Sequence, residues 1–356
     1  MEKQNKSALS EQEGVSQRDI TNASSIDSIK QKRKFQPTAD NLITDILKGD
    51  ITALSRAITL VESKNKSQIT KANAIINACL PHANNSTRIG ITGVPGVGKS
   101  TFIEAFGKHL TGIGRKVAVL AVDPSSSITK GSILGDKTRM EDLVKDKNAF
   151  IRPSASGDSL GGVARKTRES IILCEAAGFD TIIIETVGVG QSETAVHSMV
   201  DFFLLLKLAG AGDELQGIKR GIIEMADTIA INKADGDNIK PAKLAKVEFN
   251  RALHLYPKKA SEWIPKVSIC SALQNEGISE IWELVESYVT LTKNNSYFEN
   301  KRNEQNKFWL MQTIEDRLKL NFFNNKEIKE ALQIQLQLIE QHKTTPFAAA
   351  DYLLEL

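Results

Sequence analysis

The sequence predicts an α/β fold in which a mainly parallel, doubly wound sheet is flanked by helical extensions at its N- and C-terminal ends. Through the middle of the chain, short apolar runs alternate with helix-like stretches, a pattern typical of buried parallel strands. On both sides of this region the apolar residues instead recur at helical spacing. The runs expected to be strands are Ile89–Thr92, Val117–Val122, Thr181–Glu185, Phe202–Leu208, Thr228–Asn232 and Val267–Cys270.

These patterns divide the 356 residues into four segments. Residues 1–38 are polar with mixed charges, so we expect a disordered leader and not a signal peptide. Residues 39–84 predict a helical segment, because their apolar side chains fall on helical faces separated by polar breaks. Residues 85–293 hold the α/β core, and residues 294–356 predict a helical arm.

One stretch of the C-terminal arm fits two patterns. Residues 332–338 alternate apolar and polar side chains with period two, which would suit a strand. Leu332 and Leu336 also fit helical spacing with Ile328 and Ile339, and the flanking Glu, Lys and Ala residues favour a helix. We therefore expect helix here.

The composition argues against some classes of function. The formal charge is +3 and aromatic residues make up 6%, so nucleic acid is not expected as the main partner. No apolar run approaches the length of a membrane span, so no membrane partner is expected. Cys79, Cys174 and Cys270 form no CxxC pair, which suits a reducing cytoplasm and gives no zinc site.

A glycine-rich motif follows the first expected strand and opens a helix-forming stretch, the context that a phosphate-binding Walker A loop requires. Its glycines would let the backbone approach the phosphates and present N–H groups to them. Lys99 is expected to reach the β- and γ-phosphates, and the Ser100 hydroxyl to bind Mg²⁺. The fold class is therefore a P-loop NTPase, with nucleotide-binding residues Gly93, Val94, Pro95, Gly96, Val97, Gly98, Lys99, Ser100 and Thr101.

A second loop predicts that the base is guanine. Asn232, Lys233 and Asp235 form an NKxD element directly after an expected strand. The Asp235 carboxylate could accept hydrogen bonds from N1–H and N2–H₂ of guanine, while Asn232 would hold the loop and the Lys233 stem would cover the base. A loop after the last expected strand completes the base site, where a backbone N–H would contact the guanine O6; its residues are Ser271, Ala272 and Leu273.

Three carboxylates are candidates for the Mg²⁺ shell alongside Ser100. Glu185 ends one expected strand and Asp123 directly follows another, both at the end of the sheet that faces the ligand crevice, and Asp136 lies in a loop. Some of these acids are expected to act through water, because Mg²⁺ retains several waters. An N-cap or turn role for Asp123 and a plain loop role for Asp136 remain alternatives.

The sequence also predicts slow turnover. GTPases that orient the attacking water with glutamine carry it just after the DxxG element, where this chain has Val189; Gln191 comes two residues later. Hydrolysis by the isolated protein should therefore be slow until a mobile loop or a partner completes the site. Such behaviour suits a switch better than a metabolic enzyme.

Several stretches together resemble the MeaB/ArgK family of P-loop GTPases, the G proteins that attend adenosylcobalamin-dependent methylmalonyl-CoA mutase. The resemblance covers roughly residues 40–355. The matching stretches are Gly90–Thr101, Val122–Ser127, Gly135–Met140, Leu160–Glu169, Glu185–Glu193, Gly210–Glu224 and Asn232–Asp235.

The resemblance implies a GTP- and GDP-binding homodimer whose C-terminal arm helps dimerisation. It also implies that the protein docks on the mutase, gates adenosylcobalamin loading and protects the mutase, which in turn accelerates GTP hydrolysis. Ser100 is similar to the family's direct Mg²⁺ ligand, and Asp123, Asp136 and Glu185 to its metal-shell acids. Lys219 is expected to reach the nucleotide in the complex, which makes Lys99, Glu185 and Lys219 the candidate catalytic residues. From the residues alone, Lys219 would be an ordinary solvated lysine.

Two other functions are alternatives. A metallochaperone GTPase would need a Cys/His metal site, and the five histidines are scattered. A nucleotide-dependent transport-protein kinase would need an acceptor pocket and a base beside the γ-phosphate, and the sequence identifies neither.

Overall fold

A parallel sheet forms the centre of the protein. The computed structural model describes residues 37–63, 65–122, 140–153, 160–186, 192–210 and 220–356. Within these residues seven strands pair in the order β3-β2-β4-β1-β5-β6-β7, and every pair is parallel. The strands are β1 (Thr87–Gly93), β2 (Val117–Val122), β3 (Ala149–Arg152), β4 (Thr181–Thr186), β5 (Phe202–Leu208), β6 (Thr228–Asn232) and β7 (Lys266–Ile269).

The predicted α/β class is confirmed, with one strand missed. All six apolar runs lie on strands of the sheet within one or two residues of the expected bounds. β3 was not predicted because it has only four residues and lies at the edge of the sheet, where only Phe150 is buried. A continuous apolar run is therefore not required there.

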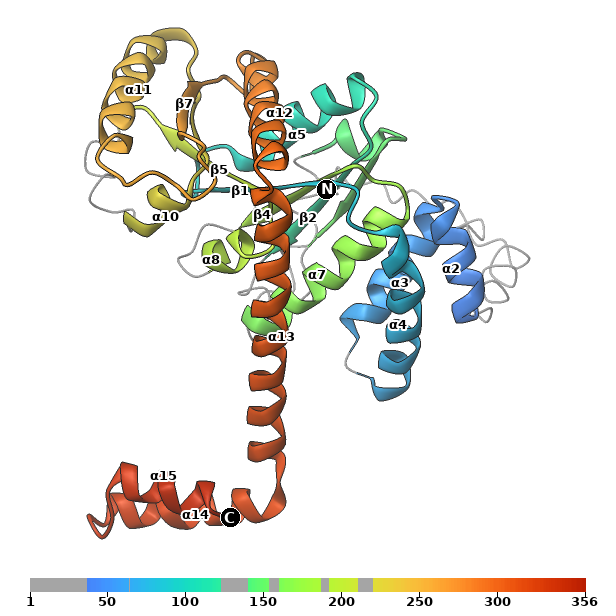
Figure 1. Cartoon of the computed structure of the whole chain (residues 1–356), viewed down its shortest axis with the longest axis vertical. Coiled ribbons are helices and arrows are strands. Elements are labelled where there is room, and N and C mark those ends of the chain that lie inside the picture. Colours follow the sequence, from blue (N-terminus) through green and yellow to red (C-terminus); the bar gives the residue numbers. More distant parts are fainter. Residues whose placement is uncertain (1–36, 64, 123–139, 154–159, 187–191, 211–219) are drawn as a thin grey trace, which may run out of the picture.

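Helices cover both faces of the sheet, as Figure 1 shows. One face packs against α7 and α8, with α3 and α4 packed on α7, and the opposite face packs against α5 and α12; α10 and α11 cover the β5–β7 end of the first face. These helices are α3 (Ile51–Glu62), α4 (Lys66–Cys79), α5 (Lys99–Gly112), α7 (Leu160–Ala176), α8 (Ser192–His197), α10 (Arg220–Met225), α11 (Ile239–Leu253) and α12 (Ile278–Asn294).

The N-terminal helices are separated by capping residues. Besides α3 and α4, this group includes α2 (Ala39–Leu47), and each helix begins after a polar N-cap. The side chains of Thr38, Asp50 and Asn65 accept hydrogen bonds from backbone N–H groups in the first turns. Their apolar faces bury Leu42, Leu54 and similar residues in the same core as α7. The expected leader, apart from residues 37 and 38, lies outside the described residues.

The C-terminal helices extend away from the sheet. α13 (Tyr297–Asn324) runs out from the core in Figure 1, and α14 (Lys326–Glu340) and α15 (Pro346–Leu354) lie at its far end. Residues 332–338 are helical, as expected, so the period-two alternation did not determine the structure there. In the described part of the chain, no helix is both long and apolar enough to cross a membrane.

Buried ion pairs join α13 to the start of β1. Arg88 donates from Nε to Glu175 at 2.9 Å, and Arg302 donates to both carboxylate oxygens of Asp201 at 2.8 and 2.7 Å. The backbone N–H of Arg88 also donates to Asp201, at 2.8 Å. Burial alone would raise the pKa of Asp201, but the hydrogen bonds and charge of Arg302 hold that pKa below its ordinary value. Each buried charge thus has a partner, which its desolvation requires.

His197, at the end of α8, should make the folded state sensitive to acid. Burial and the nearby charge of Lys301 lower the pKa of His197 to about 4. The unfolded chain takes up a proton near the ordinary value of about 6.5, so stability is lost as the pH falls from there toward 4. We expect this histidine to account for about 2 kcal/mol of stability lost between about pH 7 and pH 5.

The variant His197→Phe removes the titrating group and retains an aromatic ring against Phe203, whose ring centroid lies 5.4 Å away. Urea unfolding at several pH values measures the effect. The variant should lose less stability than the parent between about pH 7 and pH 5. Equal losses in the two proteins would rule out His197 as the source.

Candidate nucleotide site

The loop between β1 and α5 is held close to two other parts of the chain. A side chain at Gly93 would place a Cβ 2.7 Å from the carbonyl oxygen of Leu206 on β5. Gly98 has φ of +91°, and a Cβ there would lie 2.9 Å from Nδ2 of Asn232. Both positions therefore require glycine, one for close approach and one for close approach and left-handed backbone. The loop backbone therefore lies directly against β5 and the Asn232 side chain, the close wrapping that a phosphate-binding loop needs.

Lys99 begins α5 and folds back over the loop. Its Nζ donates to the carbonyl oxygen of Gly93 at 2.8 Å and to that of Val94 at 3.4 Å. Ser100 and Thr101 lie in the same first turn. The N-cap Gly98 has no side chain to cap the helix. Because α5 begins directly after the loop, its first-turn N–H groups and the positive end of its dipole lie beside the loop.

The Asn232 side chain joins three loops. Its Nδ2 donates to the carbonyl oxygen of Val97 at 2.9 Å, and its Oδ1 accepts the N–H of Ala272 at 3.2 Å. The thiol of Cys270 also approaches Oδ1, at 3.6 Å. The predicted nucleotide-binding residues from the three loops are thus brought together, although they are far apart in the sequence.

Asp235 is held by the loop that follows β7. The Ser271 hydroxyl donates to Oδ2 of Asp235, and the backbone N–H of Ala234 donates to the carbonyl oxygen of Cys270 at 3.0 Å. Lys233, directly before Ala234, has φ of +58°, an uncommon conformation for a residue with a side chain. Such local strain is common at binding sites, where surrounding contacts stabilise it. Leu273 is largely exposed at the outer end of the same loop.

Glu185 lies next to the end of β1. It pairs in register with Ile91 and is 6% exposed, so Glu185 is buried near the carboxyl ends of β1 and β4. Of the candidate metal ligands, Ser100 and Glu185 are described; Asp123 and Asp136 lie outside the described residues, as do Val189 and Gln191. The candidate catalytic residue Lys219 is outside them too.

The sequence interpretation missed a hydroxyl pair beneath the loop. Thr186 donates from Oγ1 to Oγ1 of Thr92 at 2.8 Å, and both residues are buried. Thr92 directly precedes Gly93, and Thr186 directly follows Glu185. The pair therefore links the start of the phosphate loop to the strand that carries the candidate acid. The two threonines fit their strands' β-propensity, so the sequence carries no separate signal for this contact.

The parallel sheet, the glycine loop that leads into α5 and the adjoining NKxD loop define a P-loop NTPase with the features of a GTPase. A family model described as methylmalonyl Co-A mutase-associated GTPase MeaB matches residues 54–327. The chain belongs to this family.

Relatives support the same assignment. The chain is 48% identical over 320 residues to a "Probable GTPase" of Mycobacterium tuberculosis, covering 90% of this chain and 95% of that protein. It is 44% identical over 311 residues to the GTPase ArgK of Escherichia coli, covering 87% and 94%. The mitochondrial methylmalonic aciduria type A homolog of Mus musculus is 44% identical over 332 residues, covering 90% of this chain and 80% of that protein.

A solved structure has the same fold. It is the crystal structure of a protein named LAO/AO transport system kinase, which is 38% identical and superposes with a TM-score of 0.73. The match covers 89% of this chain and 96% of that chain. The P-loop NTPase fold predicted from the sequence is therefore confirmed.

Gly98 offers a test of the loop geometry. Gly98→Ala should weaken binding of GTP and GDP by about tenfold or more, because the methyl group would press on the Asn232 amide and favour a different φ. Isothermal titration calorimetry on the full chain measures both affinities.

Gly112→Ala, at the other end of α5, is the matched control because nothing lies within 4 Å of the Cβ it would add. It should leave both affinities unchanged. If the two alanine variants bound nucleotide alike, the tight fit between Gly98 and Asn232 would have no role in binding.

Proposed function

We propose that this protein is a Mg²⁺-dependent GTPase that hydrolyses GTP slowly alone and faster with a partner. The observation that carries this proposal is a pair of hydrogen bonds made by the Asn232 amide. One goes to Val97 in the glycine-rich loop between β1 and α5, called here the phosphate-type loop, and the other to Ala272 in the loop after β7, called the base-type loop. That contact holds the two loops side by side, so that the phosphates and the base of one nucleotide would meet adjacent parts of the chain. The names of the relatives as GTPases support the reaction.

The residues have separate roles in this proposal. The backbone N–H groups from Gly93 to Thr101 and the ammonium of Lys99 would hold the phosphates, and Lys99 would neutralise charge that develops during transfer. Its present acceptors, the carbonyl oxygens of Gly93 and Val94, are in the same loop, so a short side-chain movement reaches the phosphate position. Asp235 would accept the guanine N–H groups, held in place by Ser271.

A bound Mg²⁺ would neutralise negative charge on the phosphates. The donor set fits such an ion. The Ser100 hydroxyl lies in the first turn of α5, and Glu185 is a buried residue with a carboxylate on β4, the strand that pairs with β1. Asp123 and Asp136 would complete the shell, directly or through water, and Lys219 would reach the nucleotide in the partner complex. The absence of glutamine at position 189 is the reason for slow turnover alone.

The partner in this proposal is adenosylcobalamin-dependent methylmalonyl-CoA mutase. The protein would gate adenosylcobalamin loading and protect the mutase, acting as a cytoplasmic homodimer held through α13–α15. The family description and the name of the mouse relative support the mutase. Exposed apolar side chains on the arm support the dimer, since such surfaces are commonly covered by a partner; they include Leu310, Met311, Ile314, Leu318, Leu320, Phe347 and Leu354.

The base assignment is tested by Asp235→Asn. Replacing the carboxylate by an amide presents a donor to the guanine N–H groups, so GTP affinity should fall by about 100-fold while the affinity for xanthosine triphosphate rises. Competition with a fluorescent guanine nucleotide measures both. Asp237→Asn, two residues later on the exposed turn after the loop, is the control and should not change the preference. Unchanged GTP selectivity in Asp235→Asn would reject Asp235 as the base reader.

The partner assignment is tested by GTP turnover with and without methylmalonyl-CoA mutase from the same source. We expect phosphate release to rise at least about tenfold on adding the mutase, as partner-completed GTPase sites do. Lys99→Ala should abolish the release in both conditions, which separates this protein's turnover from a contaminant's. Turnover indifferent to the mutase would retain the GTPase and reject the partner.

The name of the solved relative raises one alternative, a nucleotide-dependent kinase of a transport protein. Labelled γ-phosphate distinguishes the two functions. A GTPase passes the label to inorganic phosphate, whereas a kinase leaves it on an acceptor protein.

A further inference from the structure

The first turns of α13 contact the chain between α8 and β5. We call Lys301, Arg302, Gln305 and Trp309 the arm root. Their side chains donate to three residues of the segment 198–201. The donor–acceptor pairs are Lys301 Nζ to Asp201 O at 2.6 Å, Arg302 Nε to Asp201 Oδ1 at 2.8 Å, Gln305 Nε2 to Val200 O at 2.9 Å and Trp309 Nε1 to Ser198 O at 3.1 Å.

The segment 198–201 packs in turn against the strand that leads into the phosphate-type loop. A Cβ at Gly90 of β1 would lie 3.0 Å from Cγ1 of Val196 and 3.1 Å from Cγ2 of Val200. The backbone of β1 is therefore in close contact with α8 and the segment that follows it. Gly90 precedes Gly93 by three residues on the same strand. The arm root and the candidate nucleotide site are thus joined by continuous packing.

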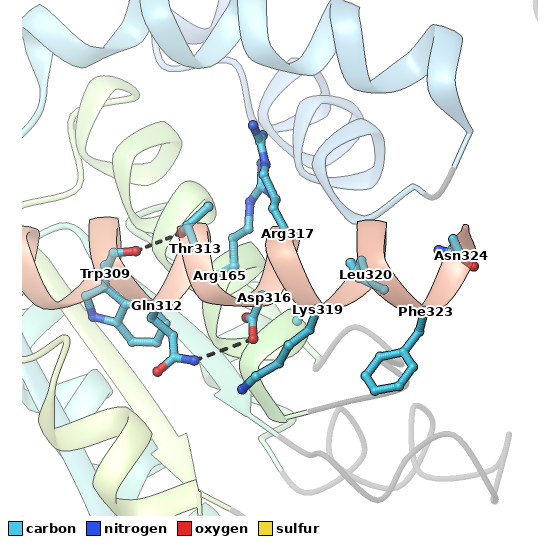
Figure 2. Close-up of a pocket in the computed structure, with 11 residues that line it drawn as sticks. Arg165, Trp309, Gln312, Thr313, Asp316, Arg317, Lys319, Leu320, Phe323 and Asn324 are labelled. Atoms are coloured by element: carbon cyan, nitrogen blue, oxygen red, sulfur yellow. Dashed lines mark hydrogen bonds between the residues drawn. The ribbon is translucent and has the colours of Figure 1, made fainter. Parts of the chain in front are cut away.

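A second contact runs through α7. The Arg168 guanidinium lies over the Trp309 ring, 4.9 Å from its centroid, and donates to the carbonyl oxygen of Gln305 at 3.1 Å and to Oδ1 of Asn306 at 2.9 Å. Beyond Trp309, side chains between Gln312 and Asn324 line a groove with Gly162 and Arg165 of α7, shown in Figure 2. The arm root thus makes hydrogen bonds to the core, whereas the later turns of α13 line this groove.

The polar groups at this junction are incompletely satisfied. Oε1 of Gln305 is buried and has no hydrogen-bond partner among the described residues. The Arg168 guanidinium donates to two neutral acceptors, the carbonyl oxygen of Gln305 and Oδ1 of Asn306. Burial and the charge of Arg88 lower the pKa of Arg168 to about 9. A buried polar atom without a partner costs free energy, so a shift that supplied one would be favourable. The junction thus holds one buried acceptor that a different arrangement could satisfy.

We infer that the guanine-nucleotide state of the site is coupled to the arm root through residues 198–201 and α8, so that GDP and GTP favour different arrangements of this junction. The inference rests on the proposed GTP binding, and it is independent of the mutase. The four arm-root side chains are positioning residues: they act on the nucleotide through α8 and β1. Coupling is reciprocal, so a change at the arm root must alter the relative affinities for the two nucleotides.

The experiment measures the affinities of the full chain for GDP and for a non-hydrolysable GTP analogue. Lys301→Met removes the ammonium that donates to Asp201 and retains the apolar stem. Lys307→Met makes the same change at an exposed lysine of α13 that pairs with Glu304, away from the core. The ratio of the two affinities should change by about threefold or more in Lys301→Met and remain unchanged in Lys307→Met.

Trp309→Phe is the second variant, in case Lys301→Met does not fold. It retains a ring beside Arg168 and removes the N–H that donates to Ser198. It should move the ratio in the same direction. A purely structural arm root would lower the melting temperature and leave the ratio unchanged, and equal weakening of both nucleotides would likewise overturn the inference.

Hydrogen exchange on the unmodified protein supplies the reciprocal measurement. The amides of Ser198, Met199 and Asp201 donate to backbone carbonyl oxygens, so their exchange reports on this segment. Their protection should differ between the GDP and GTP-analogue complexes. Identical protection would overturn the coupling. Failure of the unmodified protein to bind either nucleotide would instead reject the proposed function, which keeps the two failures apart.

Discussion

The hydrogen bonds of the Asn232 amide hold together the loops on which the candidate site depends. One side chain donates to the phosphate-type loop at Val97 and accepts from the base-type loop at Ala272. Because an amide offers a donor and an acceptor a fixed distance apart, it sets the spacing between two loops that would otherwise be independent. Gly98 permits this, since any Cβ there would displace the amide. A site for a ligand with a charged end and an aromatic end requires such a fixed spacing.

β1 connects this site to a very different environment. At its carboxyl end the strand leads into the glycine loop, and at its amino end Arg88 lies among the buried charges of Glu175, Asp201 and Arg302. Replacing such a network by apolar residues often costs little stability, so its presence is weak evidence for stabilisation alone. Its clearer consequence is geometric. Arg302 has its donors committed to Asp201, Asn84 and Ser86, which fixes the direction in which α13 leaves the core.

The sequence predicted those parts of the fold that local patterns specify. Continuous apolar runs located six strands because strands buried on both faces need apolar side chains at every position. The edge strand β3 has no such requirement and was missed. The glycine loop and NKxD elements were predicted because their chemistry needs particular residues in sequence order. The contact between Asn232 and Val97 could be expected only as proximity, since the two residues are 135 positions apart and no local pattern sets the bond between them.

The arm root could not be predicted for the same reason, and that bears on how the arm works. Periodicity assigned α13 as an amphipathic helix, but Lys301, Arg302 and Gln305 are polar residues that a helical pattern would place in solvent. They are instead turned toward residues 198–201, about a hundred positions earlier in the chain. A helix needing only anchorage would use apolar side chains, which tolerate small shifts; directional hydrogen bonds to backbone carbonyl oxygens do not. Under the proposed coupling, a shift of residues 198–201 would therefore be resisted by the arm or passed to it.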